Sequence, residues 1–160
     1  MGILQRLGGA AAILVASLGP AIAGQGCSAS AVDLRGDFGT VRMRTELAIT
    51  PDEQARGLMY REELPRLGSM LFVNGRERPL SFWMRNTLIP LDMLFIDDTG
   101  TVVRIHENAV PLDETPISSG EPALAVLEIN GGLSAELGIE EGAVLRSPAM
   151  PQDSAAWPCD

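Results

Sequence analysis

The chain contains no lysine, so all twelve of its basic residues are arginines. This absence excludes the Schiff-base lysine, the phosphate-loop lysine and the serine–lysine dyad as catalytic groups. One histidine, His106, and two cysteines, Cys27 and Cys159, exclude zinc sites that need several histidines or a cysteine cluster. The motifs G-x-S-x-G and G-x-G-x-x-G are also absent. We therefore expect no metal and no cofactor, and carboxylates remain as the groups for any catalysis.

Acidic residues outnumber basic ones by 21 to 12, which gives a formal net charge of −9. An acidic chain repels the phosphate backbone of nucleic acids, so we expect no nucleic-acid partner. A small molecule, a glycan or a protein of the cell envelope remains as the partner, and the sequence does not decide among them.

The first residues have the layout of a secretory signal peptide. Arg6 precedes a run of small and aliphatic residues from Leu7 to Leu18, and Ala21-Ile22-Ala23 offers an A-x-A cleavage site. The run is shorter than the roughly 20 residues that span a bilayer, which disfavours the alternative of a retained anchor. No later apolar run reaches that length. We predict cleavage after Ala23 and export to the periplasm, with no membrane span after processing.

The two cysteines, Cys27 and Cys159, lie near opposite ends of the chain. An even number of cysteines in an oxidising compartment is typical of disulfide bonding, and domain ends often lie close together. The sequence leaves open whether they form a disulfide or remain two unpaired thiols.

Local patterns predict a sheet with few helices. Apolar and charged residues alternate from Val41 to Leu47, as in a half-exposed strand. Thr50, Pro51 and Glu53 form a capping-box pattern, which predicts a helix from Pro51 to about Tyr60. The almost wholly apolar Leu91–Ile96 predicts a central strand covered on both faces.

The remaining segments complete the predicted fold. We expect a turn at Asn74-Gly75, a hairpin at 97–100, a long loop at 110–122 and a helical turn at 134–137. These elements predict an α+β fold, with a mostly antiparallel β-sheet curled towards a barrel, one short N-terminal helix and one or two helical turns. The predicted organisation is a signal peptide at 1–23, a flexible tail at 24–40, one β-rich domain at 41–147 and a flexible tail at 148–160.

The motifs RGLM, LFV, FWMRNTLIPLDMLFID, LE and LGI resemble those of the small prokaryotic family catalogued as domain of unknown function 192. The resemblance runs from about Val41 to Arg146. It implies a compact β-rich domain that is often exported and has no established activity. Three residues depart from the family pattern: Ser69 separates Gly68 from the following methionine, Arg85 replaces a frequent lysine, and Ala143 replaces a usual acidic residue.

The segment FWMRNTLIPLD, residues 82–92, is the first candidate site. Trp83 shares its strand face with Ser81 and Arg85, and a tryptophan beside an arginine can stack a sugar ring or hold an anionic group. We interpret Trp83, Arg85, Asn86 and Thr87 as candidate ligand-binding residues. Two alternatives remain, namely that Asn86 and Thr87 only tie the corner and that Trp83 is core beneath the 110–122 loop.

Two carboxylates, Asp92 and Glu128, lie in apolar strands, where a buried charge needs a partner. Arg56 on the predicted helix is the best candidate, so we predict a structural network of Arg56, Asp92 and Glu128. As an alternative, Asp92 and Glu128 are weak candidates for an acid–base pair in glycoside hydrolysis. We interpret His106 as a surface residue.

These observations favour a non-catalytic binding or accessory module of the cell envelope. Its ligand would be a small polar or saccharide-like molecule, or a protein partner. The first alternative is a carboxylate-based hydrolase acting on an envelope glycan, and the second is a purely structural module.

Overall fold

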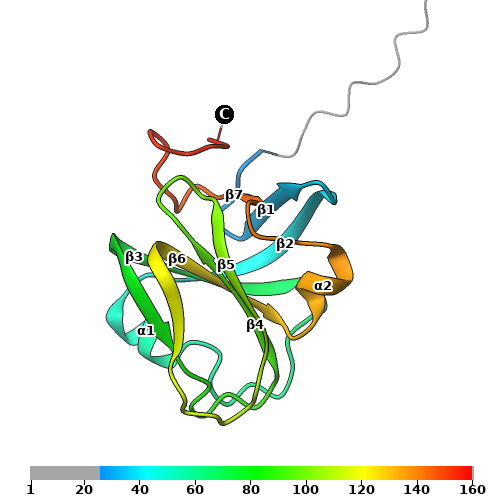
Figure 1. Ribbon diagram of the computed structural model, residues 1–160, viewed down its shortest axis with the longest axis vertical. Coiled ribbons are helices and arrows are strands. Elements are labelled where there is room, and N and C mark those ends of the chain that lie inside the picture. Colours follow the sequence, from blue (N-terminus) through cyan, green and yellow to red (C-terminus); the bar gives the residue numbers. More distant parts are fainter. Residues whose placement is uncertain (1–25, 160) are drawn as a thin grey trace, which may run out of the picture.

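The computed structural model describes residues 26–159, so the predicted signal peptide lies outside the described residues (Figure 1). These residues form a seven-stranded sheet with the order β5-β4-β6-β3-β2-β1-β7. The elements in chain order are β1 (Ala31–Gly36), β2 (Gly39–Ala48), α1 (Pro51–Arg56), β3 (Gly68–Phe82), β4 (Leu91–Ile96), β5 (Val102–Ala109), β6 (Ile117–Asn130), α2 (Leu133–Leu137) and β7 (Val144–Arg146).

The sheet curls into a half-barrel, which confirms the predicted curl (Figure 1). Its two edge strands approach each other at one end, where the backbone N–H of Val102 donates to the carbonyl of Ala143 and that of Leu145 to Gly100. All neighbouring strands pair antiparallel except β2 and β3, which are parallel. A parallel pair needs a crossover, and α1 lies in that connection.

Helix α1 begins with the predicted capping box. The Thr50 side chain accepts from the backbone N–H of Glu53, and the Glu53 carboxylate accepts from that of Thr50. The helix ends at Arg56 rather than at about Tyr60, because Gly57 and Tyr60 both have positive φ angles. The described residues contain two short helices, α1 and α2, and give no support for a helix within residues 1–25, which are not described.

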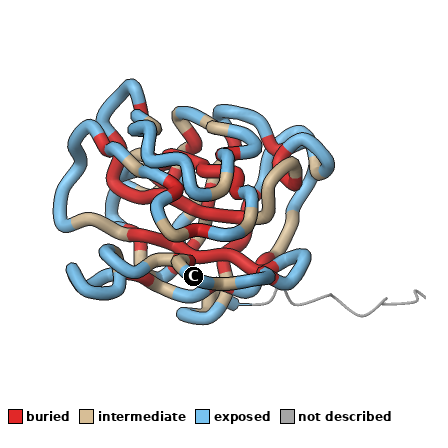
Figure 2. The backbone as a smooth tube through the Cα atoms, turned by 90° about the horizontal axis from the view of Figure 1, so that it is seen from below, coloured by how far each residue is buried: buried red, intermediate tan, exposed pale blue. Residues whose placement is uncertain are grey.

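Strand β4 and residues 123–129 of β6 are buried on both faces. Buried segments run through the middle of the molecule in Figure 2. On one face, Leu94 and Leu127 belong to a core with β1 and α2; on the other, Met93 and Val126 pack in a second core with residues next to α1. Leu91–Ile96 is buried along its whole length, as its apolar pattern predicted. The two faces of this sheet therefore pack in different cores, so polar residues of β4 and β6 that point to opposite faces do not meet.

The predicted flexible tail at 24–40 is wrong for residues 31–36, which form β1 between β2 and β7. Val32 and Leu34 of β1 are fully buried. Between them, the carboxylate of Asp33 accepts from Arg42 at 3.2 Å and from Arg146 at 2.9 Å. A strand whose partners lie so far apart in the chain is stabilised by contacts that no local pattern reveals.

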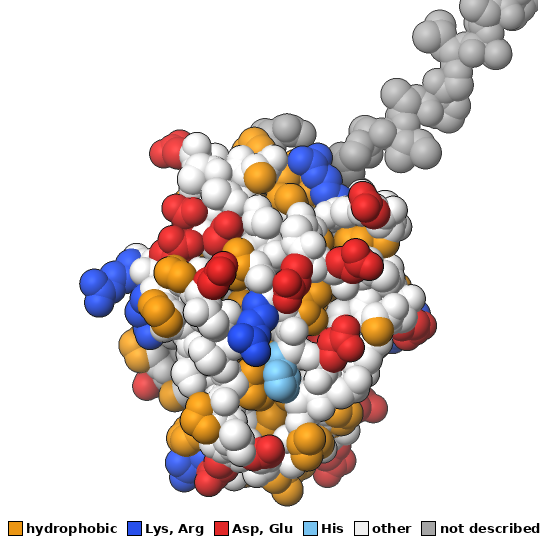
Figure 3. Space-filling model, viewed as in Figure 1, with side chains coloured by type: hydrophobic (Ala, Val, Ile, Leu, Met, Phe, Trp, Pro, Cys, Tyr) orange, Lys and Arg blue, Asp and Glu red, His pale blue; other side chains and the backbone are white. Residues whose placement is uncertain are grey.

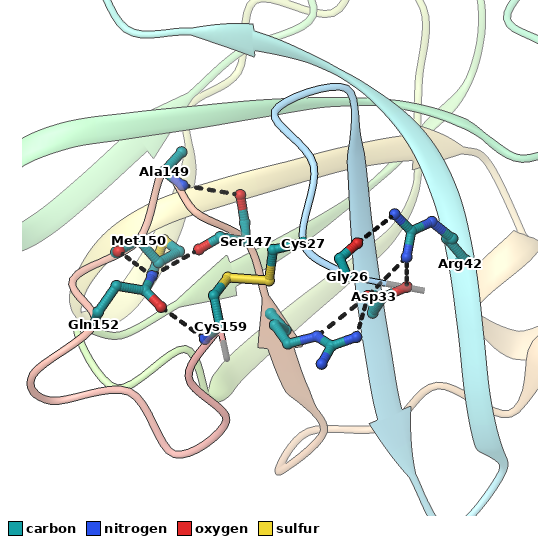
Figure 4. The surroundings of a disulfide bond; sticks show 10 residues. Gly26, Cys27, Asp33, Arg42, Ser147, Ala149, Met150, Gln152 and Cys159 are labelled. Atoms are coloured by element: carbon teal, nitrogen blue, oxygen red, sulfur yellow. Dashed lines mark hydrogen bonds and ion pairs between the residues drawn. A yellow bond between two sulfur atoms is a disulfide. The ribbon is translucent and has the colours of Figure 1, made fainter. Parts of the chain in front are cut away.

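The C-terminal segment 148–160 was also predicted to be a flexible tail, but residues 148–159 fold back onto the strands (Figure 4). Cys159 forms a disulfide with Cys27, which settles the open pairing. The Trp157 ring lies 4.4 Å from the guanidiniums of both Arg35 and Arg146. The disulfide and these cation–π contacts hold both ends of the chain against β1 and β7.

Two connections are shorter than predicted. Strand β3 continues through Asn74-Gly75, where we expected a turn, and its pairing with β6 shifts register between Val73 and Arg78. Strand β6 begins at Ile117, inside the predicted 110–122 loop. Among residues 26–159, neither helix has the length and apolar character needed to cross a membrane.

Candidate functional site

A cavity of about 290 Å³ lies between α1, β3 and the corner that follows β3. Its wall includes the second core through Phe72 and Leu80. Its polar lining comes from the two strands β3 and β6, from helix α1 and from the corner after β3. Its lining includes the charged residues Arg56, Arg78 and Glu128, the aromatic Trp83 and the hydroxyl-bearing Thr87.

Glu128 lies on β6, between Met70 of β3 and Met93 of β4. The residue is only 5% exposed, and it forms no hydrogen bond or ion pair with any residue from 26 to 159. Its carboxyl oxygens are still reached by solvent through the cavity, because no fully buried side-chain oxygen among the described residues lacks a partner. Burial among these apolar neighbours raises the pKa of Glu128 to about 8. At neutral pH the side chain is therefore mostly protonated and presents one hydroxyl donor and one carbonyl acceptor to the cavity.

Asp92 is fully buried and lies on the opposite face of the sheet. In register, Asp92 stands opposite Ile129, whereas Glu128 stands opposite Met93, the next residue along β4. Because successive residues of a strand point to opposite faces, the two carboxyl groups face different cores. They cannot flank one scissile bond, so this geometry removes the two-carboxylate hydrolase.

The partners of Asp92 are backbone amides and one hydroxyl. Its Oδ1 accepts from the N–H groups of Asn108 and Gly132, both at 2.8 Å. Its Oδ2 accepts from the N–H of Ser134 at 2.9 Å and from its Oγ at 2.5 Å. Asn108 and Gly132 have positive φ angles, so the carboxylate holds two turns with left-handed residues and the start of α2.

The predicted network of Arg56, Asp92 and Glu128 is therefore wrong. Arg56 lies on the exposed side of α1 and forms no ion pair with a described residue. Asp92 is satisfied by donors on the other face of the sheet. Glu128 shares the cavity with Arg56 but has no partner in it.

Trp83 is 47% exposed and lines the cavity, so the interpretation of Trp83 as core is wrong. The Arg85 guanidinium lies 5.4 Å from the centre of its ring. Arg85 also pairs with Glu114 at 3.4 Å, and both of these side chains are exposed. Arg85 contacts the indole but does not line the cavity, whereas Trp83 does.

Thr87 lines the cavity, whereas Asn86 does not. Asn86 has a positive φ angle, and its carbonyl accepts from the N–H of Tyr60 at 2.8 Å. Thr87 is buried; its N–H donates to the carbonyl of Met84, and its hydroxyl donates to that of Arg85. These bonds support the structural interpretation of both residues, and of the four predicted ligand-binding residues only Trp83 and Thr87 reach the cavity.

The sequence interpretation missed Arg78 of β3. The expected turn at Asn74-Gly75 separated it from the strand, and no alternation marks it, because Arg78 falls in line with the apolar Leu80 and Phe82. Arg78 donates one long hydrogen bond, of 3.4 Å, to Asn74 and forms no ion pair within residues 26–159. Together with Arg56 it gives the cavity a positive rim. No group of three or more potential metal ligands occurs in the described part of the chain.

The comparisons with known proteins agree with this fold. The family model DUF192, described as an uncharacterised ACR, matches residues 33–147. A solved protein of unknown function from Novosphingobium aromaticivorans is 49% identical, with a TM-score of 0.70, over 72% of this chain and 82% of that one. A Sinorhizobium meliloti protein described as a "putative transcription regulator" is 44% identical, with a TM-score of 0.73, over 75% of this chain and 94% of that one. No curated protein matches the chain.

Proposed function

Since this chain belongs to the DUF192 family, as its motifs suggested, and the family has no assigned function, we propose a function from the cavity itself. The protein is a non-catalytic binding module that holds a small polar or saccharide-like ligand between α1, β3 and Trp83. The observation that carries this proposal is Glu128, a buried carboxyl group without a partner at a cavity wall.

Burial of a carboxyl group costs free energy unless hydrogen bonds or ion pairs with the protein offset it, and no described residue provides such a bond to Glu128. Buried polar groups are almost always satisfied, and the exceptions concentrate at functional sites. By contrast, both carboxylate oxygens of Asp92, on the same sheet, accept hydrogen bonds from nearby backbone N–H groups. This is the pattern expected of a structural carboxylate. Glu128 therefore has hydrogen-bonding capacity at the cavity that no described residue uses, and a ligand there would meet it.

Trp83 supports a saccharide-like ligand. The residue is 47% exposed and lines the cavity, and the apolar face of a sugar ring stacks well on an exposed indole. A cavity of about 290 Å³ is near the lower end of ligand sites, so it suits a molecule of monosaccharide size rather than a polymer. Arg56 and Arg78 provide charge but no general base, which favours binding over hydrolysis.

We further propose that the protein is exported, as the signal-peptide pattern predicts. The disulfide between Cys27 and Cys159 supports an oxidising compartment. Intact mass of the secreted protein should correspond to a chain that begins at Gly24, whereas a form that retains Met1 would contradict export. The description of the S. meliloti relative suggests DNA binding, but the charge of −9 and the many acidic side chains on the face in Figure 3 do not favour it.

The test is a fluorescence titration with a panel of monosaccharides. A Trp157→Phe background leaves Trp83 as the tryptophan that reports, and saturable quenching is expected with at least one sugar. Trp83→Ala should abolish binding, measured by calorimetry, with an unchanged circular dichroism spectrum. Leu88→Ala is the matched control, because Leu88 is similarly exposed near the same corner but does not line the cavity. Equal loss in both variants, or no binding at all, would reject the proposal.

A further inference from the structure

We infer that the ligand is a small polyhydroxy acid, such as a sugar acid, whose anionic group meets Arg56 and Arg78 while one of its oxygens accepts a hydrogen bond from Glu128. This inference rests on the proposed binding function and specifies its ligand class. Beyond the proposed function, it assigns an orientation to the ligand in the cavity.

The rim of the cavity is positively charged. Arg56 comes from α1 and Arg78 from β3, and neither is paired with a carboxylate of residues 26–159. Both arginines are exposed, so their guanidinium groups are available to a ligand at the rim. The guanidinium fork matches the geometry of a carboxylate or phosphate group, so the rim favours an anion.

The wall of the cavity requires a different group. Protonated Glu128 is neutral and can donate its proton to a ligand hydroxyl or carbonyl oxygen. A second anionic group at this position would be costly in so apolar a setting, because Phe72 and Leu80 line the same wall. The ligand therefore carries its charge at one end and neutral oxygens at the other, as a sugar acid does.

A cationic ligand is the main competitor, since an amine would form an ion pair with an ionised Glu128. Such a ligand would lie between two guanidiniums that repel it, and the cavity contains no second carboxylate to offset them. The geometry consequently favours the acid over the amine.

The affinity for such a ligand should depend on pH. The charged groups that line the cavity with Glu128 are Arg56 from α1 and Arg78 from β3. The neighbours of Glu128 in the sheet are Met70 of β3 and Met93 of β4, and no other titratable side chain lines the cavity. Glu128 is the carboxyl group among the residues that line the cavity. If only the protonated form binds, affinity falls about tenfold between neutral pH and one unit above a pKa of about 8.

The experiment compares D-glucuronate, D-glucose and D-glucosamine by calorimetry at low salt, at neutral pH and one unit above the pKa of Glu128. Glucuronate should bind at least tenfold more tightly than the other two at neutral pH, and Arg78→Ala should remove this preference. Glu128→Gln keeps a donor and an acceptor, so it should bind glucuronate at both pH values with similar affinity. Arg76→Ala is the matched control, because Arg76 lies on β3 outside the cavity.

Each of the other possible outcomes would overturn the inference, and the outcomes differ in what they imply for the proposed binding function. Glucose binding as tightly as glucuronate would overturn the inference and leave the proposed binding function intact. Tighter binding of glucosamine would do the same and would assign an ionised Glu128. Loss of affinity in Glu128→Gln at neutral pH would also overturn it, since the amide would then fail to replace the acid. The absence of binding for every sugar would overturn both proposals.

Discussion

The substitution Glu128→Gln should make the stability of this protein less sensitive to pH. Burial raises the pKa of Glu128 to about 8, from an ordinary value of 4.5 in the unfolded chain. Between these two values the folded state keeps a proton that the unfolded state has released. The unfolding free energy therefore falls as the pH rises through this interval and is constant above the folded pKa.

The magnitude follows from the interval. Each pH unit costs 1.36 kcal/mol for one proton, so the roughly 3.5 units between the two pKa values correspond to about 5 kcal/mol. This is a large share of the stability of a domain of this size, which is typically about 5–15 kcal/mol. Glutamine has almost the same shape and no proton to lose, so the variant should not show this decline.

The assay is urea unfolding of both proteins with the disulfide intact, at several pH values from the lower to the upper pKa. The difference in unfolding free energy should grow with pH in favour of the variant and then level off. Glu46→Gln is the control, because its ion pair with Arg61 lowers the pKa of Glu46 and it is ionised throughout this range. A constant difference between wild type and Glu128→Gln would refute the reasoning, since Glu128 would then be ionised in both states.

Three further predictions concern the frame around the cavity. Asp92→Asn should lower the unfolding free energy by about 3–5 kcal/mol in urea titrations, because one oxygen loses its two bonds, to the N–H and Oγ of Ser134; a loss below about 1 kcal/mol would contradict the role of Asp92. Arg56→Ala should change the unfolding free energy by less than about 0.5 kcal/mol, since Arg56 is exposed and unpaired, and a loss of several kcal/mol would restore the rejected network. Replacing Cys27 and Cys159 by serine should cost up to about 5 kcal/mol for a loop of 132 residues, measured by thermal or urea unfolding, and an unchanged transition would show that the disulfide does not stabilise the fold.

The sheet could be predicted largely from local patterns, because its strands alternate in polarity or are apolar throughout. The capping box of α1 and the buried strand Leu91–Ile96 are examples. β1 could not be predicted in this way: Val32 and Leu34 enclose a charged residue, and the arginines that neutralise Asp33 come from distant parts of the chain. The end segments were missed for the same reason, since a disulfide and the Trp157 contacts hold them.

The candidate site was predicted in part. The corner around Trp83 was identified from the unusual grouping of polar and aromatic residues, and Trp83 and Thr87 do line the cavity. The partner of Asp92 was predicted wrongly because backbone N–H groups of distant turns have no sequence signature. The faces of Asp92 and Glu128 depend on strand register, which an apolar pattern on both faces does not define.

The central claim is that Glu128 is a neutral, unpartnered acid at the wall of a ligand cavity. A carbon-13 NMR titration of the glutamate carboxyl groups tests it most directly, with the Glu128 signal assigned by its absence in Glu128→Gln. We predict a midpoint of about 8 in the free protein, and a higher midpoint with saturating glucuronate, because the ligand binds the protonated form. A midpoint near the ordinary value of 4.5 would contradict the account, since Glu128 would then be a solvated or paired carboxylate.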